Sequence, residues 1–219
     1  MQTKYQMSES LRLGIFLTLS GGFQDAYSYI CRGKVFVNAQ TGNIVLLGQN
    51  LAEGDYKKAV TYLFPLLSFV GGAYLCQRIK LMSRSKSKLH WRQFVLLMEI
   101  FLLFCAGLLS SRYNTLANMM LSFVCAMQVV AFGKFHNNTY ATTMCIGNLK
   151  SATTLLCHYH ITKEVVSGKT SLCYFFIIFV FFLGAVSGAI AARYLHLHSI
   201  WIPIIFLSIA FSLMFQEET

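Results

Sequence analysis

The chain has 219 residues, of which 56% are hydrophobic and only 12% are charged. Soluble domains carry about 25% charged residues, and a soluble chain of this length could not hide so much apolar surface from water. The composition therefore excludes an ordinary soluble protein and predicts one integral membrane domain over residues 1–219.

The net charge of +10 would by itself allow nucleic-acid binding. The basic residues, however, stand in loops beside apolar segments and form no basic surface interleaved with aromatic residues. Membrane topology and anionic lipid headgroups explain them more simply. We therefore expect the lipid bilayer as a partner and no nucleic acid.

Six apolar segments approach the roughly 20 residues that cross the hydrocarbon core of a bilayer. Two further stretches, 35–52 and 138–156, are interrupted by Asn, Thr and Gly. Each of the two is either a complete polar helix, which gives eight spans, or an unwound segment followed by a half-helix that returns. The six apolar segments are 11–31, 59–79, 93–111, 116–135, 172–195 and 200–215.

The distribution of basic residues favours six spans. Lys and Arg concentrate on the cytoplasmic side of membrane proteins, and the densest cluster lies between Arg78 and Arg92. This loop and both termini then lie inside, and the N-terminal segment is a retained helix, not a cleaved signal peptide. We predict an all-α polytopic fold with about six full spans and two short broken or re-entrant helices.

One polar pattern occurs twice between the apolar segments. Gln24 lies 18 residues before Gly42, and Gln128 lies 19 residues before Gly147. This repetition predicts an internal duplication with halves at about 11–111 and 116–215. An odd number of spans in each half inverts the second half relative to the first.

The repeated residues are the candidate site. Gly with Thr or Asn can begin a half-helix inside the membrane, whose free N–H groups bind an anion or a polar molecule. Asp25, as a carboxylate at membrane depth, is a candidate for binding a ligand, proton or cation. The alternative is close helix packing, with Asn bonded locally and Asp25 joining helices. The expected lining residues are Gln24, Asp25, Asn38, Thr41, Gly42, Asn43, Gln128, Thr142, Thr143, Gly147 and Asn148.

Other polar residues have simpler interpretations. For Glu99, the only polar residue noted nearby along its segment is Arg92, which favours a structural role. Lys150 either extends to the membrane interface or is a counter-charge to Asp25. The seven cysteines show no CxxC spacing, and the two His-x-His pairs stand at predicted helix ends. We expect no metal site and no cofactor.

Enzyme motifs such as GxSxG, HExxH and a phosphate-binding loop do not occur in the sequence. The pattern favours a transporter or channel for a small polar solute or ion. One alternative is an intramembrane enzyme that uses Asp25 with a histidine, and another is a non-transporting scaffold or sensor. Homo-oligomer formation stays open.

The polar motifs resemble those of a known family. The run 21–26 (Gly-Gly-Phe-Gln-Asp-Ala), Phe36, the Thr-Gly-Asn motif at 41–43 and Leu-Gly at 47–48 are similar to the YoaK-like family of bacterial integral membrane proteins of unknown function. Gln128 and the second Thr and Gly-Asn residues match that family's weaker second set, although Ile146 stands where the family usually has Thr. The resemblance covers nearly the whole chain and implies a multi-pass protein of the bacterial inner membrane, without naming a substrate.

Overall fold

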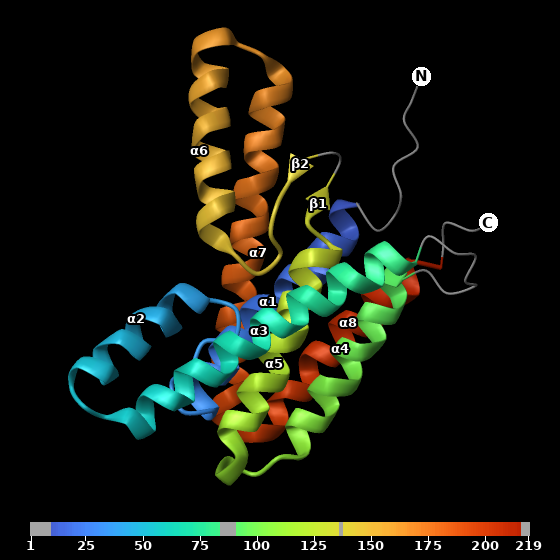
Figure 1. Cartoon of the computed structure of the whole chain (residues 1–219). Coiled ribbons are helices and arrows are strands. Elements are labelled where there is room, and N and C mark those ends of the chain that lie inside the picture. Colours follow the sequence, from blue (N-terminus) through green and yellow to red (C-terminus); the bar gives the residue numbers. More distant parts are fainter. Residues whose placement is uncertain (1–9, 84–90, 136–137, 216–219) are drawn as a thin grey trace.

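The computed structural model describes residues 10–83, 91–135 and 138–215, and these are almost entirely helical (Figure 1). Short 3-10 turns, Ser111–Tyr113 and His196–Ile200, precede α5 and α8. The antiparallel strands β1 (Lys134–Phe135) and β2 (Asn138–Thr139) lie before α6. The helices are α1 (Leu11–Cys31), α2 (Gln40–Ala52), α3 (Tyr56–Met82), α4 (Trp91–Leu108), α5 (Asn114–Ala131), α6 (Cys145–Thr162), α7 (Val165–Leu195) and α8 (Trp201–Leu213).

Four helical stretches are long and apolar enough to cross a membrane by length and composition. Large apolar side chains on their outer faces, such as Phe101, Leu172 and Phe179, are more than half exposed. Lipid is the natural partner of such surfaces, since water would penalise them. The prediction of a helical membrane protein therefore agrees with the structure. The four stretches are Tyr56–Met82, Trp91–Leu108, Ser111–Ala131 and Val165–Leu213.

Two antiparallel helices, α1 and α5, organise the bundle. The end of α1 meets the start of α5, where Arg32 Nη1 donates to Asn114 Oδ1 at 3.2 Å. Near the other end, Gln128 Nε2 donates to the Leu17 carbonyl oxygen at 3.3 Å. Helix α1 packs mainly against α7 and α8, whereas α5 packs mainly against α3 and α4.

Close packing through glycine sets the direction of α7 along α1. A Cβ atom on Gly184 would collide with the carbonyl oxygen of Leu19, and one on Gly188 would lie 2.7 Å from that of Phe23. Since both contacts advance by four residues in the same direction, α7 runs parallel to α1. Small residues of this kind let membrane helices approach closely enough for extensive van der Waals contact.

The packing of α3 against α5 is also parallel. Ser68 Oγ donates to the Met119 carbonyl oxygen at 2.7 Å, and Cys76 Sγ donates to that of Met127 at 3.3 Å. Because α1 and α5 are antiparallel, α3 and α7 are antiparallel as well. Their N-terminal ends, which carry the α2–α3 and α6–α7 turns, therefore lie toward opposite ends of the bundle (Figure 1).

A fully buried arginine closes the end of the bundle at which α1 stops. Arg32 Nη2 donates to the Ala106 carbonyl oxygen at 2.6 Å, and Nη1 donates to that of Leu109 at 2.9 Å. Its Nε donates to Tyr27 Oη at 2.8 Å. The last carbonyls of a helix carry partial negative charge, so a guanidinium is a favourable cap there. Arg32 lies just beyond the predicted end of the first span at residue 31, and the sequence indicated no role for it.

The two interrupted stretches are unwound, non-helical segments followed by a helix. Helix α2 begins only at Gln40 and α6 only at Cys145, each after a non-helical segment. Each of these helices packs mainly on the helix that follows it, so α2 with α3 and α6 with α7 form two helical hairpins (Figure 1). The predicted break between extended chain and helix is thus present, whereas re-entry into a membrane stays a prediction.

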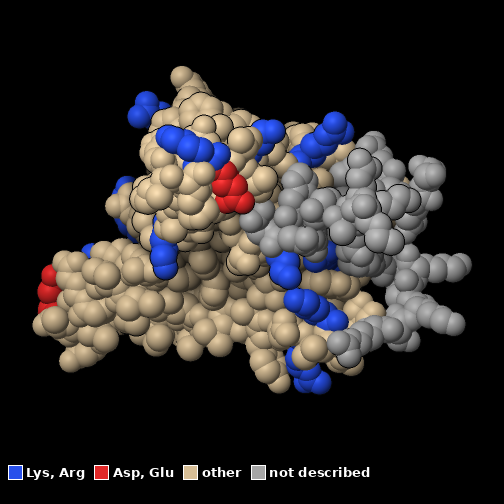
Figure 2. Space-filling model, turned by 90° about the horizontal axis from the view of Figure 1, so that it is seen from above, with Lys and Arg blue, Asp and Glu red and all other residues tan. Residues whose placement is uncertain are grey.

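Several basic residues lie at the end of the molecule that carries the α6–α7 turn. Arg92 Nε donates to the Ala131 carbonyl oxygen at 3.0 Å, so the start of α4 and the end of α5 lie at the same end. Figure 2 looks down on the face that carries the α6–α7 turn and shows Lys and Arg spread over it, with few acidic side chains. Much of the predicted basic loop, at 84–90, lies outside the described residues.

Substitution of Gly72 tests the close packing of α3 on α5. A Cβ atom there would collide with the Phe123 carbonyl oxygen, so Gly72→Ala should destabilise the protein by about 1–3 kcal/mol through overpacking. The matched control is Gly48→Ala in α2, where a Cβ atom would meet nothing within 4 Å. Thermal unfolding in detergent should show a lower midpoint for Gly72→Ala only, and equal midpoints would contradict the packing.

Candidate functional site

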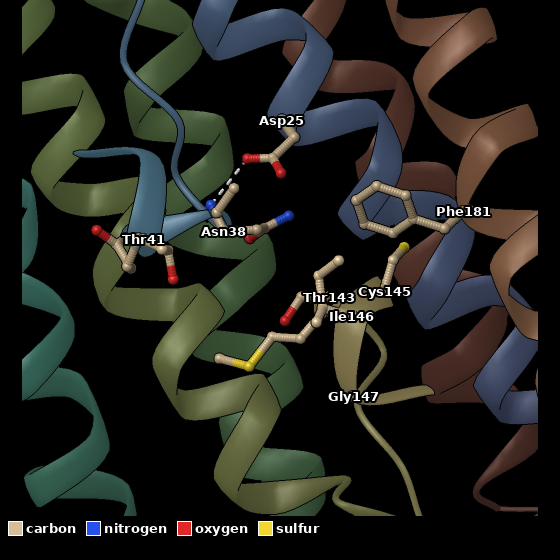
Figure 3. Close-up of a pocket in the computed structure, with 11 residues that line it drawn as sticks. Asp25, Asn38, Thr41, Thr143, Cys145, Ile146, Gly147 and Phe181 are labelled. Atoms are coloured by element: carbon tan, nitrogen blue, oxygen red, sulfur yellow. Dashed lines mark hydrogen bonds between the residues drawn. The ribbon is translucent and has the colours of Figure 1, made fainter. Parts of the chain in front are cut away.

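Two helix starts that are distant in the sequence share one cavity of about 340 Å³. Residues 38–41 at the start of α2 form one wall, and residues 143–147 at the start of α6 form another. Asp25 from α1 and Phe181 from α7 complete the lining (Figure 3). The cavity therefore lies where the unwound segment of each half of the chain meets the central helices.

Asp25 holds the segment that leads into α2. Its Oδ1 atom accepts hydrogen bonds from the backbone N–H groups of Asn38 at 2.8 Å and Val37 at 3.1 Å. The side chain is only 8% exposed, and Figure 3 shows the other carboxylate oxygen pointing into the cavity. One oxygen thus orders the backbone, and the other is available to a ligand.

The starts of α2 and α6 carry no side-chain cap. The residues that precede them, Ala39 and Met144, make no capping hydrogen bond. The first N–H groups of a helix lack partners within the helix and carry partial positive charge. The first turn of α6, which includes Cys145, Ile146 and Gly147, lines the cavity. The site therefore combines a carboxylate on one wall with the uncapped start of a helix on another.

The asparagines of the two Gly-Asn motifs make the same local contacts. Asn43 bonds both backbone groups of Phe36, accepting from its N–H at 3.1 Å and donating to its carbonyl oxygen at 2.5 Å. Asn148 does the same to Ala141, at 3.1 and 2.7 Å. Each asparagine thus ties its helix to the residue seven positions earlier. Both side chains therefore follow the alternative in which each asparagine bonds locally. They lie behind the cavity wall.

The two glutamines are buried in the bundle and do not line the cavity. Gln128 Nε2 donates to Thr142 Oγ1 at 2.7 Å, which attaches α5 to the segment before α6. Gln24 Nε2 donates to Ser20 Oγ at 2.9 Å and to Glu99 Oε1 at 3.3 Å. Both glutamines were expected to be buried, and they are. Their hydrogen-bond partners, however, lie within the bundle and not in a shared cavity.

The structure thus divides the candidate residues into two groups. Those in the cavity lining are Asp25, Asn38, Thr41, Thr143 and Gly147. Those outside the lining are Gln24, Gly42, Asn43, Gln128, Thr142 and Asn148. Lys150, which could have been a counter-charge, is exposed on α6 and forms no ion pair with Asp25 within the described ranges.

Sequence reasoning missed several lining residues. Phe181 and Asp25 line both this cavity and an adjoining, mostly apolar groove of about 440 Å³ along α1 and α7. Nothing distinguishes Phe181 in sequence, because it stands in a run of phenylalanines whose members face different directions. Cys145 was treated only as a small hydrophobic residue, although it stands next to the Gly-Asn motif.

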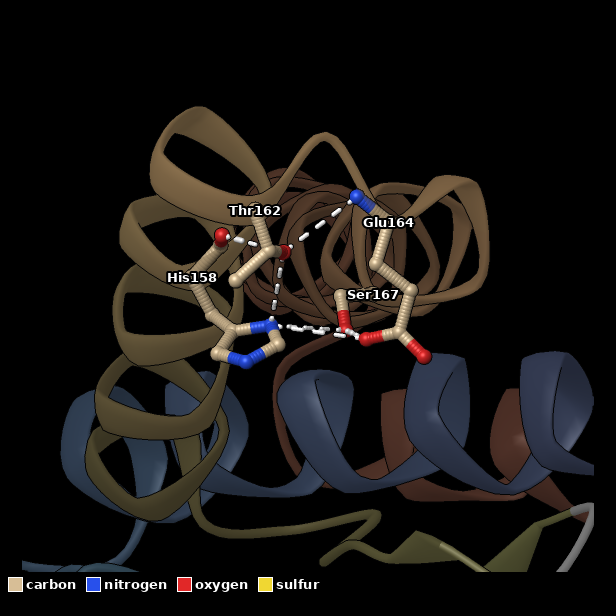
Figure 4. A network of polar contacts seen from close by, with 4 residues as sticks. All are labelled: His158, Thr162, Glu164 and Ser167. Atoms are coloured by element: carbon tan, nitrogen blue, oxygen red, sulfur yellow. Dashed lines mark hydrogen bonds and ion pairs between the residues drawn. The ribbon is translucent and has the colours of Figure 1, made fainter.

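The histidine with the most polar contacts, His158, lies near the end of α6, before the turn into α7. His158 Nδ1 lies 3.2 Å from Ser167 Oγ and 3.4 Å from Glu164 Oε2 (Figure 4). Ser167 Oγ donates to Glu164 Oε2 at 2.6 Å, so the hydroxyl proton is directed to the carboxylate and not to the imidazole. This exposed cluster links the two helices of the hairpin and does not reach Asp25.

The part of the chain that the structure describes contains no visible set of metal ligands. No group of three or more His, Cys, Asp or Glu side chains there could hold an ion. The described hydrogen bonds of Asp25 go to backbone N–H groups, which suits a carboxylate that orders a loop.

A bundle of apolar helices with a cavity between two helix starts is the architecture of a polytopic membrane protein. The chain belongs to the family described as protein of unknown function (DUF1275), which matches residues 13–213. This match runs from the first turn of α1 to the last residue of α8. No match was found among curated proteins or among solved structures.

Thiol labelling tests access to the cavity. With Cys145 as the only cysteine, a small cationic methanethiosulfonate should react several-fold faster than a neutral one of similar size, because Asp25 faces the same cavity. Asp25→Asn should remove this preference and leave the neutral reagent's rate unchanged. A protein with Cys125 alone, which is fully buried, is the unreactive control. Equal rates for both reagents before substitution would exclude an exposed charge on Asp25.

Proposed function

We propose that this protein transports a small polar solute or ion across the bacterial inner membrane, as the resemblance to the YoaK-like family suggests for its location. The observation that carries the proposal is the cavity in which Asp25 faces the start of α6. Unwound backbone is tolerated at membrane depth only where it is buried in protein or lines a wet cavity. Transporters use such breaks to bind their substrates.

The proposal includes an inverted two-fold repeat. Its support is that α1 and α5 are antiparallel, and that each packs against the last two helices of the other half. The matching contacts of Asn43 and Asn148 add local support. In this arrangement the fourth apolar stretch, Val165–Leu213, supplies two spans, α7 and α8, and α1 joins the four stretches to give six spans, whereas α2 and α6 are half-helices.

The cavity favours a solute that carries both a hydrogen-bond donor and an acceptor. The free oxygen of Asp25 accepts from a donor or pairs with a cation, and the first N–H groups of α6 bind an acceptor. A volume of about 340 Å³ suits a small metabolite more closely than a peptide or lipid.

Blocking the cavity at Gly147 tests the proposed transport. Gly147 lines the cavity, and a Cβ atom there would meet nothing within 4 Å, so Gly147→Leu should fill the space without disturbing the fold. Gly48→Leu in α2 is the matched control, because its surroundings are equally open and it lies outside the cavity.

The measurement is flux in proteoliposomes, screened over small ions and polar metabolites. The wild type and Gly48→Leu should transport the same solute, and Gly147→Leu should not. Asp25→Asn should also lose flux while remaining folded, because Asn lacks the charge that faces the cavity. Flux that survives Gly147→Leu would remove the cavity from the pathway, and the absence of flux for every solute would favour a scaffold or sensor.

The inverted repeat places the two hairpin turns on opposite sides of the membrane. On a cysteine-free background, Glu53→Cys in the α2–α3 turn should react with an impermeant thiol reagent in intact cells. Lys163→Cys in the α6–α7 turn should react only after permeabilisation, because basic residues favour the cytoplasmic side. Labelling of both positions from the same side would contradict the inverted arrangement.

A further inference from the structure

A second acidic residue lies inside the bundle, away from the cavity. Glu99 on α4 is completely buried, and its Oε1 atom accepts one hydrogen bond, from Gln24 Nε2 at 3.3 Å. Its Oε2 atom has no hydrogen-bond partner among the described residues, and neither has Gln24 Oε1. Two buried acceptor oxygens on adjoining side chains thus lack a donor.

No cation compensates Glu99 within the described part of the chain. Arg92, two turns before it on α4, donates from Nε to the Ala131 carbonyl oxygen. Arg32 lies toward the other end of α4, where it caps the carbonyls around Ala106. Helix α8 carries no titratable residue. Titratable groups on the elements around α4 include Asp25 on α1, Cys125 on α5, Cys76, Arg78 and Lys80 on α3, and His196 and His198 in the 3-10 turn before α8, and Glu99 forms no ion pair with any of them among the described residues.

An ionised Glu99 in this position would be costly. A buried carboxylate needs a counter-charge or several hydrogen bonds, and a single unsatisfied buried acceptor already costs about 1–3 kcal/mol. One bound proton removes the charge and supplies the donor that the two orphan oxygens lack. A metal ion would need several more oxygen ligands, whereas one proton suits this site.

We propose that Glu99 is a proton-binding site, protonated in the state described here, whose proton is exchanged with water during transport. The coupling part of this proposal rests on the proposed transport function, whereas the bound proton does not. On release the proton passes to water that enters the bundle, and Glu99 is left as a carboxylate until a proton from water replaces it.

The contacts of Gln24 connect this site to the cavity. Gln24 makes the hydrogen bond to Glu99, and the next residue on α1, Asp25, faces the cavity. Cys125 lies within electrostatic range of both carboxyl groups, and its Sγ is 3.8 Å from Thr143 Oγ1 in the cavity wall. A solute that shifts α1 or the start of α6 therefore changes the surroundings of Glu99.

Infrared spectroscopy of the purified protein tests the bound proton without a substrate. At neutral pH the wild type should show the C=O stretching band of a protonated carboxylic acid, shifted on exchange into D₂O. Glu99→Gln, which keeps the shape and neutrality of the protonated side chain, should fold and lose this band. Glu164→Gln is the matched control, because Glu164 is exposed in the α6–α7 turn, and it should keep the band. A wild-type spectrum without the band, or a band that survives Glu99→Gln, would overturn the proposal.

The coupling is tested with the solute found in the flux screen. A pH gradient should drive its accumulation by the wild type, whereas Glu99→Gln should exchange the solute without responding to the gradient. Accumulation that follows a sodium gradient and not a pH gradient would overturn coupling through protons. If no solute is transported at all, the proposed function fails, while the infrared band still reports on the proton at Glu99.

Discussion

The hydrogen bonds from Asp25 to the backbone of residues 37 and 38 are the interaction on which the site depends. The chain leaves the helical conformation at the end of α1 and resumes it at Gln40, so the intervening backbone groups need partners from elsewhere. Buried backbone groups without a partner are costly. Asp25 supplies two acceptor contacts, and Asn38 Nδ2 returns one to the Gly21 carbonyl oxygen at 2.6 Å. Together with the hydrogen bond from Gln40 Nε2 to Ser122 Oγ on α5, these contacts fix the start of α2.

The second half solves the same problem with different residues. Asn148 plays the part of Asn43, but a threonine hydroxyl and Gln128 replace the contacts made by Asp25. The cavity is therefore chemically asymmetric, with the carboxylate contributed by α1 alone. Under the proposed function, this asymmetry would let the cavity bind a solute in a single orientation.

The sequence predicted the local features of the fold well. Long apolar runs gave the helices, and the Gly, Thr and Asn interruptions marked where α2 and α6 begin, because these residues favour caps and unwound chain. Asp25, Asn38, Thr41 and Thr143 became candidates because polar residues are rare in an apolar chain, and Gly147 because it belongs to the repeated Gly-Asn motif; all five line the cavity. These signals depend on neighbours in sequence, so a single chain reveals them.

The features that sequence reasoning missed depend on contacts between distant segments. Gln24 and Glu99 are 75 positions apart, and only the packing of α1 beside α4 brings them together. From sequence alone, Arg32 likewise looks like the polar end of a span. Only the folded structure shows that it caps the last carbonyl groups of α4. Asn43 was expected to face the cavity because its motif suggests a ligand site, but bonds to its own preceding segment satisfy it.

The distribution of tight contacts indicates which parts would move under the proposed transport function. Helix α1 is held against α7 by glycines that leave no room for a side chain, and Arg32 fixes its end to α4 and α5. By contrast, α2 and α6 pack mainly on the single helix that follows each of them. The two hairpins are thus less constrained than the central bundle. Because both cavity walls opposite Asp25 belong to the starts of α2 and α6, tilting of either hairpin changes access to the carboxylate while the bundle stays intact.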